Sequence, residues 1–129
     1  MIALLDTNAF LRWVEGDESL STRARSCIAN PDNEILVSVV VAWELAIKSG
    51  QGGIKLAMPV GRYVASHIEA NGFRLLGIEL DDVAVIETLP HHRDPFDRLL
   101  IAQAKQMPAR LLTADNQLPI YSELVELIA

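Results

Sequence analysis

The 129-residue chain has little cysteine and few aromatic side chains. Its one cysteine, Cys27, excludes an internal disulfide and fits a reducing compartment. Aromatic residues make up 5% of the chain and hydrophobic residues 50%, so the core is expected to be aliphatic. The one cysteine and three histidines show no zinc-ligand spacing, which leaves oxygen ligands for any metal ion.

Long hydrophobic runs are also absent. The longest uncharged apolar stretch, residues 35–43, is about half of the ~20 residues that a membrane-spanning helix needs. The apolar run at residues 1–5 ends at Asp6 and has no basic flank, which does not fit a signal peptide. We therefore expect a soluble, cytoplasmic protein that forms a single domain over residues 1–129.

Positive charge is scarce, since 11 Lys and Arg residues against 17 Asp and Glu residues give a net charge of −6. This balance argues against binding nucleic acid over a broad basic surface. It does not exclude a nucleic-acid enzyme, because clustered metal-binding carboxylates would themselves contribute negative charge. A bound cation would then reverse the local sign.

Signals for strands and helices alternate along the chain. Short apolar runs predict buried strands at residues 2–5, 34–37, 74–80 and 110–113. Capping residues and apolar periodicity predict helices at residues 9–14, 22–29, 39–49, 59–70, 81–89 and 95–106, while residues 122–129 fit either a short helix or a fifth strand. The alternation predicts an α/β fold with a parallel sheet covered on both faces. In such sheets ligands bind at the carboxyl ends of the strands, where the strand order switches.

Residues 91–104 contain the clearest helix start. Asp94 is a favourable N-cap, Pro95 suits the first helical position, and Asp97 falls at the third. At helical spacing Asp97 shares a face with apolar residues, so it lies at the edge of the buried side. Burying an unpaired carboxylate is costly, and Asp97 therefore needs a partner.

Four carboxylates form the candidate site. Asp6 ends the first predicted strand, Asp115 follows the fourth, and Glu44 and Asp97 lie on apolar helix faces. If the first and fourth strands are neighbours, all four acids can face one pocket. Such an oxygen-only set suits Mg²⁺ or Mn²⁺.

Each acid also has a structural interpretation. These are a helix cap for Asp6, an Asx turn with Asn116 for Asp115, a helix-surface pair with Lys48 for Glu44, and a capping arrangement with Asp94 for Asp97. The functional interpretation rests on the set, in which two acids end strands and two project from apolar helix faces. Supporting roles are expected for Thr7 and Thr113 beside the strand-end acids, and for Asp94 as a cap.

Four segments resemble the signature blocks of PIN-domain ribonucleases, and most of all those of VapC-type toxins of bacterial type II toxin–antitoxin systems. The segments are residues 4–8 (LLDTN), 41–48 (VAWELAIK), 92–104 (HRDPFDRLLIAQA) and 111–115 (LLTAD). Their order and spacing span nearly the whole chain, and the third block extends over thirteen residues.

The resemblance implies a three-layer α/β/α PIN-like domain with a central parallel β-sheet. It implies RNA cleavage by a site that binds one or two Mg²⁺ or Mn²⁺ ions through Asp6, Glu44, Asp97 and Asp115. It also implies a homodimer and a small antitoxin that blocks the pocket. The candidates for RNA contact are Arg93, Arg98 and Lys48.

Two other interpretations stay open at the level of sequence. A phosphoacceptor receiver domain would need an acid pair at the end of the first strand, but Asp6 is followed by Thr7 and Asn8. It would also need an aspartate ending the third strand, and none is evident. The second alternative is a catalytically silent module that binds RNA or protein.

Overall fold

The computed structural model describes residues 1–90, 94–122 and 124–128. Its described strands form one fully parallel sheet in the order β3-β2-β1-β4-β5. These strands are β1 (Ile2–Leu5), β2 (Glu34–Ser38), β3 (Arg74–Leu76), β4 (Arg110–Thr113) and β5 (Val125–Leu127). The predicted parallel sheet is thereby confirmed, and β1 lies at its centre beside β4.

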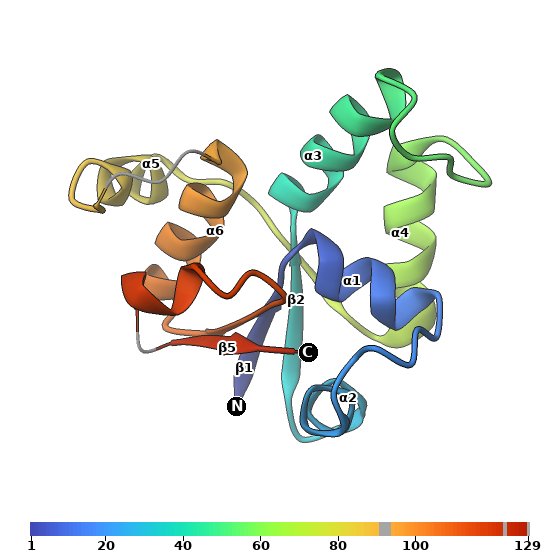
Figure 1. Ribbon diagram of the computed structural model, residues 1–129, viewed down its shortest axis with the longest axis horizontal. Coiled ribbons are helices and arrows are strands. Elements are labelled where there is room, and N and C mark those ends of the chain that lie inside the picture. Colours follow the sequence, from blue (N-terminus) through green and yellow to red (C-terminus); the bar gives the residue numbers. More distant parts are fainter. Residues whose placement is uncertain (91–93, 123, 129) are drawn as a thin grey trace.

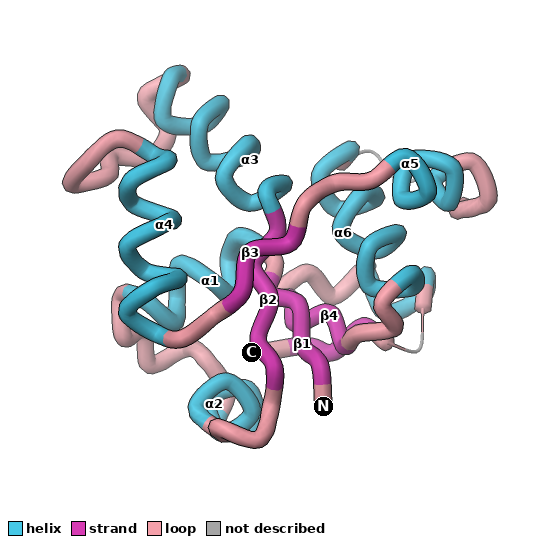
Figure 2. Tube along the Cα trace, turned by 180° about the vertical axis from the view of Figure 1, so that it is seen from behind, coloured by secondary structure: helices cyan, strands magenta, loops and turns pink. Residues whose placement is uncertain are grey.

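Helices cover both faces of this sheet, so the fold has three layers (Figures 1 and 2). They are α1 (Thr7–Val14), α2 (Thr22–Ala29), α3 (Val39–Gly50), α4 (Val60–Asn71), α5 (Leu80–Ile86), α6 (Pro95–Gln106) and the short 3₁₀ helix η1 (Leu118–Tyr121). In Figure 1, α5 and α6 lie on one side of the sheet, and α1, α2 and α4 lie on the other. Within the described ranges, none of the helices is long and apolar enough to cross a membrane.

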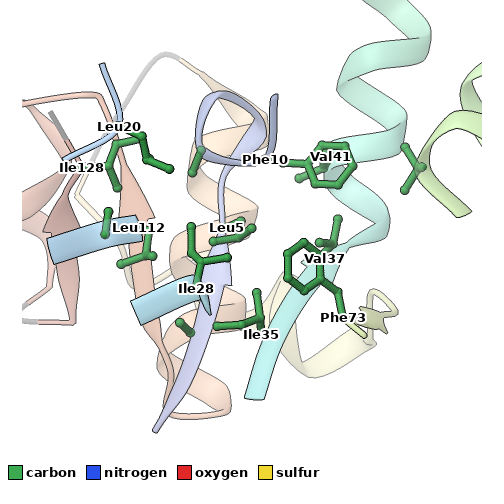
Figure 3. Packing of buried hydrophobic residues seen from close by; sticks show 14 of the residues in the cluster. Leu5, Phe10, Leu20, Ile28, Ile35, Val37, Val41, Phe73, Leu112 and Ile128 are labelled. Atoms are coloured by element: carbon green, nitrogen blue, oxygen red, sulfur yellow. The ribbon is translucent and has the colours of Figure 1, made fainter. Parts of the chain in front are cut away.

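The strands alternate their side chains between two aliphatic cores, as expected for a sheet buried on both faces. Leu5 packs with Phe10 in the core under α1–α4 (Figure 3), whereas Leu4 packs with Leu100 and Ile101 in the core under α5 and α6. All of these side chains are buried. The central strand therefore contributes to both cores, and its carboxyl end is fixed from both sides.

The strand order of the sheet switches at β1. β2 and β3 extend the sheet on one side of β1, and β4 and β5 extend it on the other. The crevice where ligands bind in such sheets lies at the carboxyl ends of the two strands that flank this switch. Asp6 follows β1 directly, and Ala114 and Asp115 follow β4.

One expectation about the sheet edges needs revision, and one open alternative is decided. The strand predicted over residues 74–80 ends at Leu76, because its neighbour β2 ends at Ser38 and leaves no partner beyond that register. Gly77 follows the strand, so no aspartate ends β3 as a receiver domain would require. At the C-terminus the fifth strand forms, and it is the strand alternative rather than the helix that holds.

A substitution at the end of α4 tests whether the backbone there requires glycine. Gly72 adopts φ +67° at the C-cap, a left-handed conformation that costs an L-residue about 1–2 kcal/mol. Gly72→Ala is therefore expected to lower the melting temperature by about 3–8 °C. Gly61→Ala in the first turn of the same helix is the matched control. An added methyl group would meet open space at both glycines, so a loss at Gly61 equal to that at Gly72 would contradict the explanation.

Candidate active site

A cavity of about 150 Å³ gathers the predicted acids. It is lined by Asp6, Thr7, Asn8, Glu44, Lys48, Asp94, Asp97 and Asp115. These residues come from the end of β1, the start of α1, the middle of α3, the start of α6 and the loop after β4. Asn8 was not among the predicted site residues; its position directly after Asp6 and Thr7 at a strand end is the signal that could have identified it.

Asp6 is a buried member of the set, with 5% of its surface exposed. Its Oδ1 accepts a 2.8 Å hydrogen bond from the Ala9 backbone N–H and thereby caps α1. The pKa of Asp6 is raised from 3.8 to about 6, chiefly because burial disfavours the charged form. Hydrogen bonds from Thr113 and Ala9 lower this pKa, whereas the negative charges of Asp97 and Glu44 raise it.

Glu44 lies in the pocket with 6% exposure, although it directly follows the exposed Trp43 on α3. Thr7 Oγ1 donates a 2.7 Å hydrogen bond to its Oε1, and Lys48 Nζ lies 2.5 Å from its Oε2. The ion pair with Lys48 that the spacing suggested is therefore present. It is no ordinary surface pair, because the Glu44 side chain is only 8% exposed.

Asp94 is the N-cap of α6 and Asp97 lies in its first turn, where the two side chains have different roles. Asp94 Oδ1 accepts hydrogen bonds from the backbone N–H groups of Phe96 (2.8 Å) and Asp97 (3.2 Å), and Pro95 occupies the first turn as predicted. Asp97 is half-buried and lines the pocket, and its charge acts on both Asp6 and Lys48. The predicted capping role thus falls to the Asp94 side chain, which is bonded to the backbone of Asp97.

An aromatic contact fixes the distance between the two helices that carry pocket acids. Trp43 and Phe96 each directly precede a pocket acid, and their rings meet edge to face with centroids 4.7 Å apart. The contact ties α3 to the first turn of α6. It thereby positions Glu44 relative to Asp97.

Asp115 lies in a hydrogen-bonded turn that includes Thr113, a residue that is also hydrogen-bonded to Asp6. Its Oδ1 accepts a 2.9 Å hydrogen bond from the Gln117 backbone N–H, so the predicted Asx turn forms, with Gln117 as the donor rather than Asn116. The buried Thr113 hydroxyl accepts a 3.0 Å hydrogen bond from the Asp115 backbone N–H and is hydrogen-bonded to the Asp6 carboxylate. Thr113 therefore links the two strand-end acids.

The three basic residues predicted to contact phosphate have different positions. Lys48 lines the pocket. Arg98 does not line it, because its Nη2 donates a 3.0 Å hydrogen bond to the Ile86 carbonyl and joins α6 to the end of α5. Arg93, like His91 and His92, lies outside the described residues.

The pocket does not form a complete metal-ligand cage. No group of three or more His, Cys, Asp or Glu side chains within residues 1–90, 94–122 and 124–128 is arranged so that it could hold a metal ion. The donor chemistry is nevertheless uniform, since the acids present only oxygen atoms. Mg²⁺ retains several waters in most protein sites, so one or two such carboxylates with water suffice for it.

Comparison with known proteins gives a consistent result. The model of the family described as PIN domain matches residues 3–124. Ribonuclease VapC22 of Mycobacterium tuberculosis (strain ATCC 25618 / H37Rv) is 33% identical over 120 residues, which cover 89% of this chain and 88% of that protein.

Solved structures share the fold at low sequence identity. The crystal structure of VapBC2 from Rickettsia felis, bound to a DNA fragment from the promoter, matches with a TM-score of 0.74 at 17% identity over 100% of both chains. VapBC-5 from Mycobacterium tuberculosis, a member of the VapBC family of toxin–antitoxin systems, matches with a TM-score of 0.59 at 19% identity, over 98% of this chain and 97% of that one. The three-layer architecture is thus shared with structures of toxin–antitoxin systems.

The raised pKa of Asp6 predicts a pH-dependent loss of stability in the presence of a chelator. Below pH 3.8 the carboxyl is protonated in both the folded and the unfolded protein; between 3.8 and about 6 only the unfolded protein releases the proton readily. Stability is therefore lost as pH rises through this window, by about 3 kcal/mol in total. Asp6→Asn keeps the cap oxygen and removes the charge, so it is expected to be more stable than the wild type at pH 8 and equally stable near pH 4.

Urea unfolding in EDTA across this pH range measures the effect. Asp81→Asn, which removes an exposed acid from the first turn of α5, corrects for the general effect of one negative charge fewer. A gain for Asp6→Asn of the same size at pH 4 and pH 8 would show that ionisation of Asp6 does not destabilise the fold.

Proposed function

Because the chain belongs to the PIN-domain family and is a VapC-type ribonuclease, we propose that the acidic pocket is its active site. In this proposal the pocket hydrolyses RNA phosphodiester bonds with the help of Mg²⁺ or Mn²⁺. One observation carries the assignment: Asp6, Glu44, Asp97 and Asp115, far apart in the sequence, line one cavity at the switch point of the sheet.

A divalent cation fits the electrostatics of this pocket. Asp6 is buried close enough to Asp97 and Glu44 for their charges to raise its pKa. A cation among these carboxylates would remove that repulsion and favour the ionised form of Asp6. We propose that Asp6, Asp97 and Asp115 surround the ion, with one or two of these carboxylates bound to it directly and water completing its coordination.

The side chains around these acids would keep the pocket in a single arrangement. Thr113 orients Asp6 and Asp115 together, since it is hydrogen-bonded to both. Thr7 orients Glu44, and Asp94 aims Asp97 from the helix cap. When bound, the ion supplies a Lewis acid that lowers the pKa of a water molecule and neutralises charge on the phosphoryl oxygens.

The substrate would reach this site through its backbone at a single point rather than over a charged surface. The chain carries a net charge of −6. Among the described residues that line the pocket, Lys48 is the one with a cationic side chain. Single-stranded RNA suits such a site, because its backbone and bases are accessible without opening a helix. Arg98, bound to the Ile86 carbonyl, is a weaker candidate for RNA contact than Lys48.

We also propose that a small antitoxin binds this chain and that two copies form a homodimer. Support for the antitoxin comes from the solved structures of similar fold, which belong to toxin–antitoxin systems. An apolar groove between α3, α4 and β3 offers a surface for an amphipathic helix of such a partner. Its lining residues are Val39, Ala42, Gly61, Val64, Ala65, Ile68 and Leu75.

Metal binding is expected to stabilise the fold. At a free Mn²⁺ concentration 100 times the dissociation constant, the gain in unfolding free energy is about 2.7 kcal/mol. Asp97→Asn should abolish most of this gain, because it removes a proposed ligand. Asp81→Asn, which removes an exposed acid outside the pocket lining, is the matched control and should keep the full gain. Thermal unfolding with and without Mn²⁺ measures the difference, and equal stabilisation of the wild type and Asp97→Asn would overturn the metal assignment.

Cleavage itself is tested with single-stranded and hairpin RNAs in Mn²⁺. The wild type should cleave, and Asp6→Asn should lower the rate by at least ~100-fold, since a metal ligand contributes several kcal/mol to stabilising the transition state. Asp81→Asn, outside the pocket lining, should cleave at the wild-type rate. Unchanged cleavage by Asp6→Asn would instead identify a contaminating nuclease.

A further inference from the structure

Both carboxylate oxygens of Glu44 are engaged by side chains of the chain itself. Thr7 Oγ1 donates to Oε1 at 2.7 Å, and the Lys48 ammonium contacts Oε2 at 2.5 Å. An oxygen that already accepts a short hydrogen bond from a cation is a poor ligand for a second one. Glu44 therefore differs from Asp6, whose hydrogen-bond donors, the Ala9 N–H and the Thr113 hydroxyl, are neutral.

Lys48 is placed to act on the pocket and not only on Glu44. Its side chain is 48% exposed and lines the cavity, so its ammonium group is accessible from solvent while it touches a buried carboxylate. The hydrogen bond to Glu44 raises the pKa of Lys48 above its ordinary value, and the charges of Asp94 and Asp97 act in the same direction. The positive charge is thus held firmly among three acids.

We infer that the active site binds one divalent ion, on the side of Asp6, Asp97 and Asp115, and that the Lys48 ammonium takes the place of a second ion beside Glu44. This inference rests on the proposed function and specifies its metal stoichiometry. In this arrangement Lys48 is a fixed positive group that faces the phosphate of the bound RNA. Glu44 is a positioning residue, which holds the ammonium in the pocket rather than binding metal.

Charge and geometry both favour this arrangement over two ions. A second divalent ion at Glu44 would lie beside the ammonium that contacts Oε2, and two neighbouring cations in a partly buried site repel each other strongly. To bind there, the ion would have to break the Lys48 contact and also compete with the Thr7 hydroxyl.

The test is a count of bound Mn²⁺ per chain, by electron paramagnetic resonance and isothermal titration calorimetry. The wild type should bind one ion. Lys48→Met removes the charge while keeping a long apolar side chain, and should bind two ions, the second at least ~10-fold more tightly than any further ion in the wild type. Lys48→Arg, which keeps the charge, should bind one. The double variant Lys48→Met, Glu44→Gln should return to one, because the freed carboxylate is removed.

The outcomes separate this inference from the proposed function. Two ions of comparable affinity in the wild type, or one ion in Lys48→Met, would overturn the role of Lys48 and leave the nuclease proposal standing. No bound ion in any variant would overturn the metal site itself. Circular dichroism of each variant confirms that the count refers to folded protein. Lys48→Met is expected to fold because the Lys48 side chain is 48% exposed and does not belong to the hydrophobic core.

Discussion

Asp6 has only 5% of its surface exposed because β1, whose Ala3, Leu4 and Leu5 side chains are fully buried, ends inside the molecule. The same carboxylate caps α1 through Ala9, so the start of that helix and the position of the acid depend on one hydrogen bond. Packing from both faces of the sheet prevents the strand end from moving toward water. The site thus depends on a charged group that the fold holds where ionisation is unfavourable, and the neighbouring residues compensate for it.

That compensation is local and uses structural hydrogen bonds. Asp6 is hydrogen-bonded to Thr113, and Asp115 accepts a hydrogen bond from the backbone N–H of Gln117. The carboxylate of Glu44 accepts hydrogen bonds from Thr7 and Lys48. The structural and functional interpretations of these acids are therefore compatible with one another. A neutral cap or turn donor orients a carboxylate and leaves its negative charge in place, whereas at Glu44 an ammonium group also neutralises that charge. The N-caps of α1 and α6 therefore place acids at the pocket as well as begin helices.

Much of this could be predicted from local patterns. Residues 2–5 and 110–113 form strands as expected, and Asp94 and Pro95 begin α6 as their capping preferences indicate. The missed features depend on neighbours distant in sequence. The length of β3 depends on where β2 ends, and Arg98 contacts the Ile86 carbonyl, which no local pattern reveals. Likewise, the spacing of Glu44 and Lys48 suggested a pair, but the burial of Glu44 and its hydrogen bond from Thr7 on α1 depend on contacts between segments distant in sequence.

The energetics of the proposed metal site follow from the burial of Asp6. Raising the pKa of this carboxyl to about 6 costs the folded protein about 3 kcal/mol at neutral pH. A ligand at 100 times its dissociation constant contributes about 2.7 kcal/mol, which is of the same size. In the proposed function, metal binding would therefore restore the stability that the arrangement of the acids removes. Lys48 would meet part of the same requirement without any dissociable ion, because its charge is attached to the chain. In that arrangement, only one of the two positive charges beside the acids would depend on the metal concentration.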